Sequence, residues 1–328
     1  MQRAATSVVS QPPCDQENVM LSGSTIETRV TKADFEDRRA RLTALNLIRP
    51  VRRLLGHLWE APGITALRRR FYFANFRRGR PTYGFFGLYS SLEAARQSAP
   101  KGLIGYDHDS LTSMEISGFR GGVEPSFGPM ASSEYPLLFW LRPLLSNGMR
   151  VFDFGGYLGN GFYLYRPYLD YPSGMTWTVC DVPAVAHAGQ ALADRKGETQ
   201  LRFTTEIAEA SNAEVLIAAG SLQYLEEGFL PKHLAAMPRR PRHVFVHRTP
   251  LHPQAGYVTM QTWHDGRSPV FCPYTVAHRD RLVAEMEALG YEVVDSWEKP
   301  RALDVPLHPE CRLDAYAGFY FRLGGTTA

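Results

Sequence analysis

Residues 151–161 read VFDFGGYLGNG, an apolar run that leads into a turn crowded with glycines. Residues 177–183 read WTVCDVP, a second apolar run that is closed by Asp181. Glycines let a backbone turn sharply and approach a ligand where a Cβ would collide, and a helix that follows directs its free N–H groups to the same place. An acid that closes the next strand can accept hydrogen bonds from a ribose. The two segments therefore predict a strand–turn–helix unit that binds a nucleotide-type cofactor.

The spacing of these glycines bears on which cofactor is bound. It is not the GxGxxG of a dinucleotide-binding turn. It fits better the D-x-G-x-G-x-G turn of class I S-adenosylmethionine-dependent methyltransferases, with Tyr157 where their middle glycine usually lies. The alternative is a tightly packed glycine turn that binds no ligand.

Length and composition indicate a globular protein with a substantial core, since 44% of its 328 residues are hydrophobic. The four cysteines, Cys14, Cys180, Cys272 and Cys311, form no CxxC pair, which argues against a zinc or disulfide framework and favours a reduced, cytoplasmic setting. No apolar run approaches the roughly 20 residues that cross a bilayer, so we expect no transmembrane segment. A net charge of +3 is too small to indicate nucleic-acid binding, and homodimerisation is left open.

The pattern divides the chain into three parts. Residues 1–30 lack periodicity and are interpreted as a disordered tail. Residues 31–130 are interpreted as a helical cap on the substrate side, in which Ser90 or Ser91 begins a short helix. Residues 131–328 are interpreted as a Rossmann-like domain. Because we find no long insertion in that domain, we expect the cap to enclose the site.

From residue 151 onward the expected strands and helices alternate, which is typical of an α/β fold. Apolar strands such as VLIAA at 215–219 favour a parallel sheet that is covered on both faces. The last two strands follow each other without a long helix, which indicates an antiparallel hairpin at the C-terminus. We therefore predict a Rossmann-like, seven-stranded sheet of the class I methyltransferase type. The expected strands lie near 151–154, 177–181, 200–203, 213–219, 242–247, 291–297 and 316–323, and the expected helices near 160–166, 183–194, 229–236 and 278–289.

Several short motifs, spread over about three quarters of the chain, carry a specific resemblance. They are GLYSSLEAA and GYD in the front portion, then FDFGGYLGNGFY, W-x-V-C-D-V-P, AAGSLQYL, HRTPL, YVTMQ and CPY. From Phe86 to the C-terminus the chain resembles a family of bacterial class I methyltransferases whose genes tend to lie in polysaccharide and natural-product clusters. The resemblance implies S-adenosylmethionine as the cofactor.

Carried over position by position, the resemblance also implies a cofactor site. The glycine turn would surround the methionine half of the cofactor, with the bulk of Tyr157 pointing away from it or closing over it. Asp181 would accept the ribose hydroxyls, and Val182 would pack near the adenine. The implied cofactor-binding residues are Asp153, Phe154, Gly155, Gly156, Tyr157, Gly159, Asp181, Val182, Gly220, Ser221 and Leu222.

Methyl transfer from a sulfonium is an in-line displacement, so alignment supplies most of the acceleration and a base is needed only for an acceptor that holds a proton. We find no acidic cluster for magnesium and no HExxH, so we expect no metal. The catalytic candidates are His247, which could take a proton near pH 7, Arg248, which could clamp a carboxylate or phosphate, and Tyr224. Their structural alternatives are a buried hydrogen-bonding histidine, a surface ion pair and a core aromatic.

Substrate contacts are expected from the cap and from the segments that follow the fourth and fifth strands. The cap would supply an apolar wall with a few orienting polar groups. The predicted substrate-binding residues are Tyr106, His108, Gln223, Tyr257 and Gln261.

These features together indicate an S-adenosylmethionine-dependent methyltransferase that acts, without metal, on oxygen or nitrogen of a small-molecule acceptor of the natural-product or sugar type. The main alternative is a catalytically silent relative in which the cofactor fold serves binding or scaffolding. A nucleotide-cofactor oxidoreductase is disfavoured by the missing GxGxxG and by the terminal strand pair.

Overall fold

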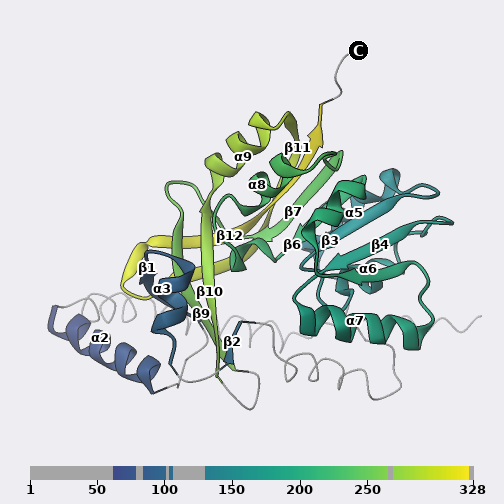
Figure 1. Ribbon diagram of the computed structural model, residues 1–328. Helices are drawn as coiled ribbons and strands as arrows, with labels where there is room; N and C mark the ends of the chain where they lie inside the picture. Colours follow the sequence, from purple (N-terminus) through teal and green to yellow (C-terminus); the bar gives the residue numbers. More distant parts are fainter. Residues whose placement is uncertain (1–61, 79–83, 101–102, 106–129, 265–268, 325–328) are drawn as a thin grey trace, which may run out of the picture. The chain divides into compact units, whose positions relative to one another are not determined.

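The computed structural model (Figure 1) describes residues 62–78, 84–100, 103–105, 130–264 and 269–324. The chain separates into two units, Met1–Ala66 and Leu67–Ala328, and the elements discussed below belong to the second unit. The tail expected over residues 1–30 lies outside the described residues. Within the described ranges, no helix is both long enough and apolar enough to cross a membrane.

A seven-stranded sheet has the strand order β11–β12–β7–β6–β3–β4–β5. The neighbours from β7 to β5 run parallel, whereas β12 runs antiparallel to both β7 and β11. This arrangement confirms the predicted Rossmann-like sheet with an antiparallel C-terminal hairpin. The strands are β3 (Arg150–Phe154), β4 (Thr176–Cys180), β5 (Leu201–Thr204), β6 (Val215–Ala219), β7 (His243–Thr249), β11 (Tyr291–Val305) and β12 (His308–Leu323).

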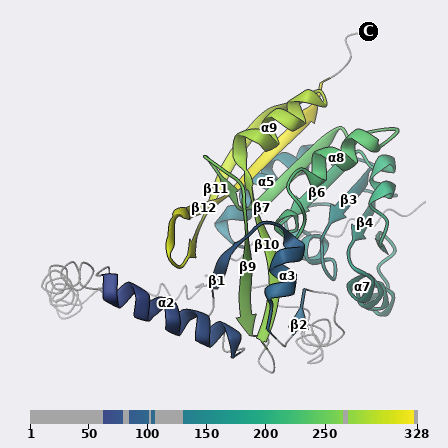
Figure 2. The same ribbon diagram turned by 60° about the vertical axis from the view of Figure 1, so that its left-hand side comes forward.

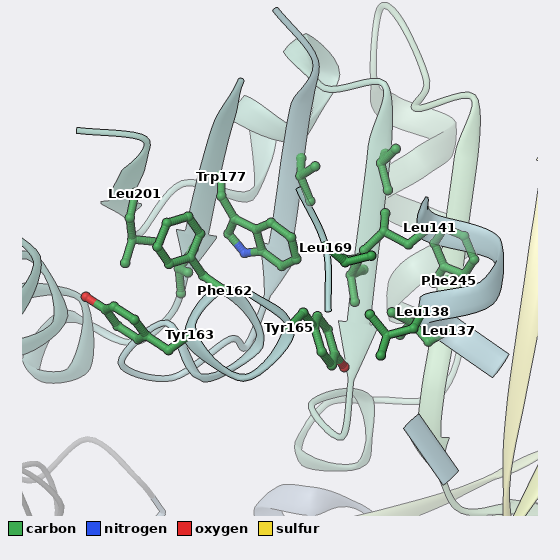
Figure 3. Packing of buried hydrophobic residues seen from close by; sticks show 14 of the residues in the cluster. Leu137, Leu138, Leu141, Phe162, Tyr163, Tyr165, Leu169, Trp177, Leu201 and Phe245 are labelled. Carbon is green, nitrogen blue, oxygen red and sulfur yellow. The ribbon is translucent and has the colours of Figure 1, made fainter. Parts of the chain in front are cut away.

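The central strands β3, β6 and β7 are buried on both faces of this sheet, which explains why they are mostly apolar. Alternate side chains of a strand point to opposite faces, so Val151 packs in one cluster and Phe152 in another. Figure 3 shows the leucines of α5 next to Phe245 on the first face. That face is covered by α5 (Tyr135–Leu141), α6 (Asn160–Tyr165) and α7 (Pro183–Lys196), and the second face by α8 (Phe229–Ala236) and α9 (Arg279–Ala288).

Local sequence signals set the helix ends. Helix α3 (Leu92–Ser98) begins as expected, because the Ser91 Oγ accepts a hydrogen bond from the Ala94 N–H at 3.1 Å. Helix α7 begins at Pro183, where the N–H that proline lacks would have no helical partner. It ends at Gly197, whose φ of 67° lies in the left-handed region that favours glycine.

A second sheet joins distant parts of the chain. Strand β1 (Gly84–Tyr89) pairs antiparallel with β9 (Tyr257–His264), which pairs antiparallel with β10 (Pro269–His278). The short strands β2 (Leu103–Ile104) and β8 (Leu251–His252) both run parallel to β10. Figures 1 and 2 show α3 alongside β9 and β10, which form a long twisted ribbon.

This second sheet corrects two expectations. In its described part the region 31–130 is not a purely helical cap, because it contributes β1 and β2 as strands. The Rossmann-like domain does carry an insertion, since β8, β9 and β10 stand between β7 and α9. Residues 257–263, YVTMQTW, are rich in the aromatic and β-branched types that favour strands. Their partner β1 lies far earlier in the chain, so local pattern could not reveal the pairing.

The β11–β12 hairpin supports the second sheet. Its strands are 15 and 16 residues long and continue past Ala317, which pairs with the last residue of β7. Beyond that point Leu303 and Leu313 of the hairpin pack with Tyr274 and Val276 of β10. The second sheet therefore rests on an extension of the first.

The hairpin contains one tight contact that yields a prediction. Gly318 pairs with Trp297, and a Cβ on Gly318 would lie 2.1 Å from the indole Nε1. That indole donates a hydrogen bond to the His247 Nδ1 at 2.9 Å. We expect Gly318→Ala to displace the ring, break this bond and lower the free energy of unfolding by about 2–3 kcal/mol.

Chemical denaturation of both proteins measures this change. Gly324→Ala serves as the control, because a Cβ there would come no closer than 3.4 Å to any neighbour. An unfolding free energy for Gly318→Ala that equals that of the control would contradict the tight packing of Trp297.

Candidate functional site

A cavity of about 930 Å³ opens at the carboxyl ends of β3, β4, β6 and β7. Strand β4 lies on one side of β3, and β6, which comes later in the chain, lies on the other side. The order of the strands therefore reverses at β3, and ligands of open α/β sheets bind at such a switch point. The second sheet contributes the opposite part of the wall through β2, β9 and β10. The volume lies near the upper end of the range for small-molecule sites, roughly 300–1,000 Å³.

Contacts with neighbouring residues require a glycine at position 155 of the turn. The Gly155 N–H donates to the Cys180 carbonyl at 2.7 Å, which holds the turn against β4. Gly155 has a φ of +70°, and a Cβ on it would lie 2.2 Å from the Ser221 Cβ. Ser221 is fixed in turn, because its Oγ donates to the Phe154 carbonyl at 2.7 Å. A side chain at position 155 would therefore separate β3 from the turn after β6.

Tyr157 occupies the position of the missing middle glycine with a glycine-like backbone. Its φ is 55°, in the left-handed region that non-glycine residues rarely adopt. Its N–H donates to Asp181 Oδ2 at 2.9 Å, and its ring lines the cavity while packing against the core. The departure from the glycine pattern thus leaves the turn's conformation intact.

Asp181 ties the two strand ends together. One carboxylate oxygen accepts from the Tyr157 N–H, and the other accepts from the Val182 N–H at 2.8 Å. The carboxylate lines the cavity next to the exposed Val182. Each oxygen of a carboxylate can accept a second hydrogen bond, so Asp181 can still receive donors from a ligand.

Asp153 lies beneath the turn and is almost fully buried. Its Oδ2 accepts a hydrogen bond from the Trp177 Nε1 at 3.1 Å. Burial raises the pKa of Asp153 to about 7, helped by the nearby charge of Asp181 and opposed by Trp177 and Arg248. The residue can therefore change its charge near neutral pH at the edge of the cavity.

Glu134, at the start of α5, forms the centre of a buried polar cluster. The Tyr165 hydroxyl donates to its Oε2 at 2.8 Å, and its Oε1 lies 3.4 Å from an Arg248 nitrogen. The His247 Nε2 lies 3.2 Å from Oε2. Burial alone would raise the pKa of Glu134, but His247, Arg248 and Tyr165 together lower it to about 2. Glu134 and Arg248 therefore form an ion pair.

His247 does not lie on the cavity wall. Its ring has no exposed surface, and its Nδ1 accepts from the Trp297 indole at 2.9 Å. The proton of the neutral ring then sits on Nε2, toward Glu134. Burial lowers the pKa of His247 in spite of that carboxylate. The ring is therefore buried and held by Trp297 and Glu134, and it does not reach the cavity.

Arg248 and Tyr224 do reach the cavity. Arg248 has a φ of 53°, and its guanidinium donates to the Ala219 carbonyl at 3.0 Å while facing Glu134. Tyr224 lines the cavity, and its hydroxyl donates to the Gln261 Oε1 at 3.1 Å. The backbone of Arg248 is strained, and strained residues of this kind cluster at functional sites.

The structure distributes the remaining predicted residues unevenly. Two expected cofactor contacts, Gly159 and Leu222, are not part of the cavity wall. Gly159 is the N-cap residue of α6, and Leu222 packs against the core on the second face of the sheet. The cavity wall includes the other nine predicted cofactor residues: Asp153, Phe154, Gly155, Gly156, Tyr157, Asp181, Val182, Gly220 and Ser221.

The predicted substrate residues are mostly elsewhere. Tyr257 donates its hydroxyl to the Cys311 carbonyl and packs under the hairpin, and the Gln223 amide donates to the Gly220 carbonyl. Gln261 accepts a hydrogen bond from the Tyr224 hydroxyl and is not part of the cavity wall. Tyr106 and His108 lie outside the described residues. Where the structure is described, no three His, Cys, Asp or Glu side chains gather as metal ligands would.

Sequence reasoning missed many residues of the cavity wall, and three of the polar residues that it missed shape the cavity or its floor. Arg96 of α3 and Cys272 of β10 line the wall, and Glu134 holds Arg248. The sequence signal for Glu134 is its position directly before the apolar run YPLLFWL, which would bury it. A buried charge needs a partner of opposite charge. Nothing local indicates Arg96, because α3 reaches the site only through the second sheet.

Comparison with solved structures finds methyltransferases at low similarity. The N1-methyltransferase of 1,6-didemethyltoxoflavin from Burkholderia thailandensis is 17% identical over 66% of this chain and 88% of its own, with a TM-score of 0.40. An S-adenosylmethionine-dependent methyltransferase from Clostridium acetobutylicum is 9% identical over 66% and 99%, with a TM-score of 0.42. The magnesium protoporphyrin IX methyltransferase from Synechocystis is 11% identical over 66% and 100%, with a TM-score of 0.40.

No protein-family model matches the chain, and no curated protein does. Similarities to solved structures of this size assign neither a cofactor nor an activity. A functional conclusion has to come from the geometry of the cavity.

The raised pKa of Asp153 predicts a pH-dependent stability. An acid whose pKa is about 7 in the folded protein and 3.8 in the unfolded chain stabilises the fold at low pH, and this contribution is lost as pH rises through 7. Asparagine mimics the neutral acid. We therefore expect Asp153→Asn to match the wild type near pH 4 and to exceed its unfolding free energy by on the order of 4 kcal/mol at pH 8.

Chemical denaturation at pH 4, 6 and 8 measures this difference. The exposed Asp170, changed to Asn, is the matched control and should follow the wild type at each pH. A wild-type-like pH dependence in Asp153→Asn would show that Asp153 stays ionised in the fold.

Proposed function

We propose that this protein is a methyltransferase that uses S-adenosylmethionine and methylates oxygen or nitrogen of a small-molecule acceptor of the natural-product or sugar type. One observation carries the proposal. The glycine turn after β3 and the acid after β4 face a single cavity, and the second sheet closes that cavity from the other side. In this proposal the nucleoside lies beside the turn and Asp181, and the rest of the cavity is left for the acceptor.

The residues of the turn fit such a cofactor. The ribose of a nucleoside offers two hydroxyl donors, for which the Asp181 carboxylate is the matching acceptor. The methionine half carries an ammonium group, and an ionised Asp153 at the cavity edge would favour it. The turn itself requires glycine, because Cβ atoms at Gly155 and Gly156 would collide with Ser221 and Asp153. S-adenosylmethionine, when bound, supplies an electrophilic methyl group.

The protein's own contribution to the reaction is alignment and exclusion of water. Phe229, Trp263 and Pro273 give the cavity apolar surface around the reacting groups. The Tyr224 hydroxyl, fixed by Gln261, is placed to orient an acceptor atom. Arg248 balances the charge of Glu134 beneath the floor, and His247 holds that pair in position. We propose no metal in this reaction, because displacement at a sulfonium needs none.

The two other classes of function make different predictions. A silent relative would bind S-adenosylmethionine but yield no methylated product, so only an acceptor screen with a labelled methyl donor separates it from an enzyme. An oxidoreductase would bind NAD instead. Calorimetry with S-adenosylmethionine, S-adenosylhomocysteine and NAD tests the proposal directly, and binding of NAD alone would overturn it.

Asp181→Ala tests the cofactor site. The variant loses both ribose hydrogen bonds to a charged acceptor, so we expect binding of S-adenosylhomocysteine to weaken by about 2–4 kcal/mol. Calorimetry measures the affinity, and circular dichroism checks that the variant is folded. Glu198→Gln, at a charged site away from the cavity wall, is the control. Unchanged affinity in a folded Asp181→Ala protein would disprove this assignment.

Chelation tests the metal-free mechanism. Once an acceptor is found, turnover should be the same in EDTA as in buffer, because in our proposal no step draws on a metal ion. The readout is the rate of methylated product formed. Loss of turnover that magnesium or zinc restores would refute the mechanism while leaving the cofactor assignment intact.

A further inference from the structure

The part of the cavity wall that α3 and the second sheet contribute is largely apolar. It contains Leu92 of α3, Ile104 of β2, and Trp263 and Pro273 of β9 and β10. Tyr224 and Phe229 continue it from the side of the first sheet. Trp263 is held in place, because it packs with Val270 and Cys272 of the neighbouring strand. Rigid aromatic and proline surfaces of this kind favour a planar apolar ligand over a hydrated one.

Two arginines of the described residues, Arg96 and Arg248, line the cavity, and their charges are compensated to different degrees. Arg248 is paired with the buried Glu134 and also donates to the Ala219 carbonyl. Arg96, on α3, has Glu93 at 3.8 Å as its one ion-pair partner among the described residues, and both side chains are more than half exposed. An exposed ion pair of this type contributes little, on the order of 0–1 kcal/mol. Glu93 also accepts a hydrogen bond from Gln97, so the charge of Arg96 is the less neutralised of the two.

In the part of the wall that the structure describes, no neighbour compensates the charge of Arg96. Cys272 lies close enough to feel its charge, but burial raises the pKa of that thiol to about 11, so it is neutral at pH 7. Among the described residues of α3, β2, β9 and β10 that line the cavity, none is acidic. The carboxylates of the cavity, Asp153 and Asp181, belong to the cofactor side.

We propose that the acceptor is a planar aromatic acid, whose ring lies against the wall of Trp263, Ile104 and Pro273 and whose carboxylate pairs with Arg96. The proposal rests on the proposed function and names its substrate class. A guanidinium matches a carboxylate through two parallel hydrogen bonds, and the surrounding apolar wall strengthens that pairing by excluding water. A sugar would leave its hydroxyls without partners on this wall, and a cation would meet Arg96.

Three probes separate these possibilities by calorimetry on the full chain. They are 1-hydroxy-2-naphthoic acid, its uncharged amide 1-hydroxy-2-naphthamide, and glucose 6-phosphate, which is anionic but not aromatic. We expect the acid to bind about fivefold more tightly than the amide, which is the upper end of what an ion pair at a half-exposed site contributes. We expect no measurable binding of the sugar phosphate.

Two variants assign the effect to residues. Arg96→Gln should remove the preference for the acid and leave the affinity for the amide unchanged, whereas Trp263→Leu should weaken acid and amide alike by about tenfold. The control is Arg195→Gln, an exposed arginine of α7 that is not part of the cavity wall. Equal binding of acid and amide, a preference that survives Arg96→Gln, or tighter binding of the sugar phosphate would each overturn the proposal.

The experiment is run with and without S-adenosylhomocysteine, so that its failure is distinguishable from failure of the proposed function. No binding of S-adenosylhomocysteine would refute the methyltransferase assignment, while the acid–amide preference would still decide the ligand class of the wall. Binding of S-adenosylhomocysteine without any acid preference would retain the methyltransferase and reject the aromatic acid. Increasing salt should reduce the preference, because Arg96 is exposed.

Discussion

The buried ring of His247 links the parts of the protein that make the cavity. Through Trp297 it contacts the hairpin, and through Glu134 it contacts the start of α5 and the guanidinium of Arg248. A buried ion pair is stable only when its remaining polar atoms have partners, and removing one member leaves an uncompensated charge. The floor of the cavity, the first helix of the domain and the hairpin therefore depend on one polar cluster.

The hairpin carries this dependence to the other side of the site. Its proximal part completes the seven-stranded sheet, and its distal part packs against β10. The hairpin therefore has two roles. It completes the edge of the seven-stranded sheet, and it supports the wall of the cavity that the second sheet contributes. The wall is consequently built from rigid sheet, and rigid walls hold two reactants in alignment better than loops do.

Two residues with left-handed backbones mark the same cavity. Tyr157 and Arg248 have φ values of 55° and 53°, and both line the site. Such conformations persist when surrounding contacts hold them, as Asp181 holds the Tyr157 N–H and Ala219 holds the Arg248 guanidinium. Tyr157 therefore adds a side chain to the turn while its backbone keeps the left-handed conformation that a glycine would adopt.

The sequence by itself determined the sheet and the strand ends that border the cavity, because apolar strands, glycine turns and helix ends are local signals. It predicted the strand ends that bring Asp181 to the turn, and nine of the eleven residues proposed for the cofactor line the cavity. Only the tertiary structure decided which polar residues face that cavity and which are buried. His247 and Glu134 are 113 residues apart in sequence and meet only because β7 and α5 pack together, and Arg96 and Trp263 share a wall only through the second sheet. Such contacts depend on pairing between distant segments, for which a single sequence carries no local signal.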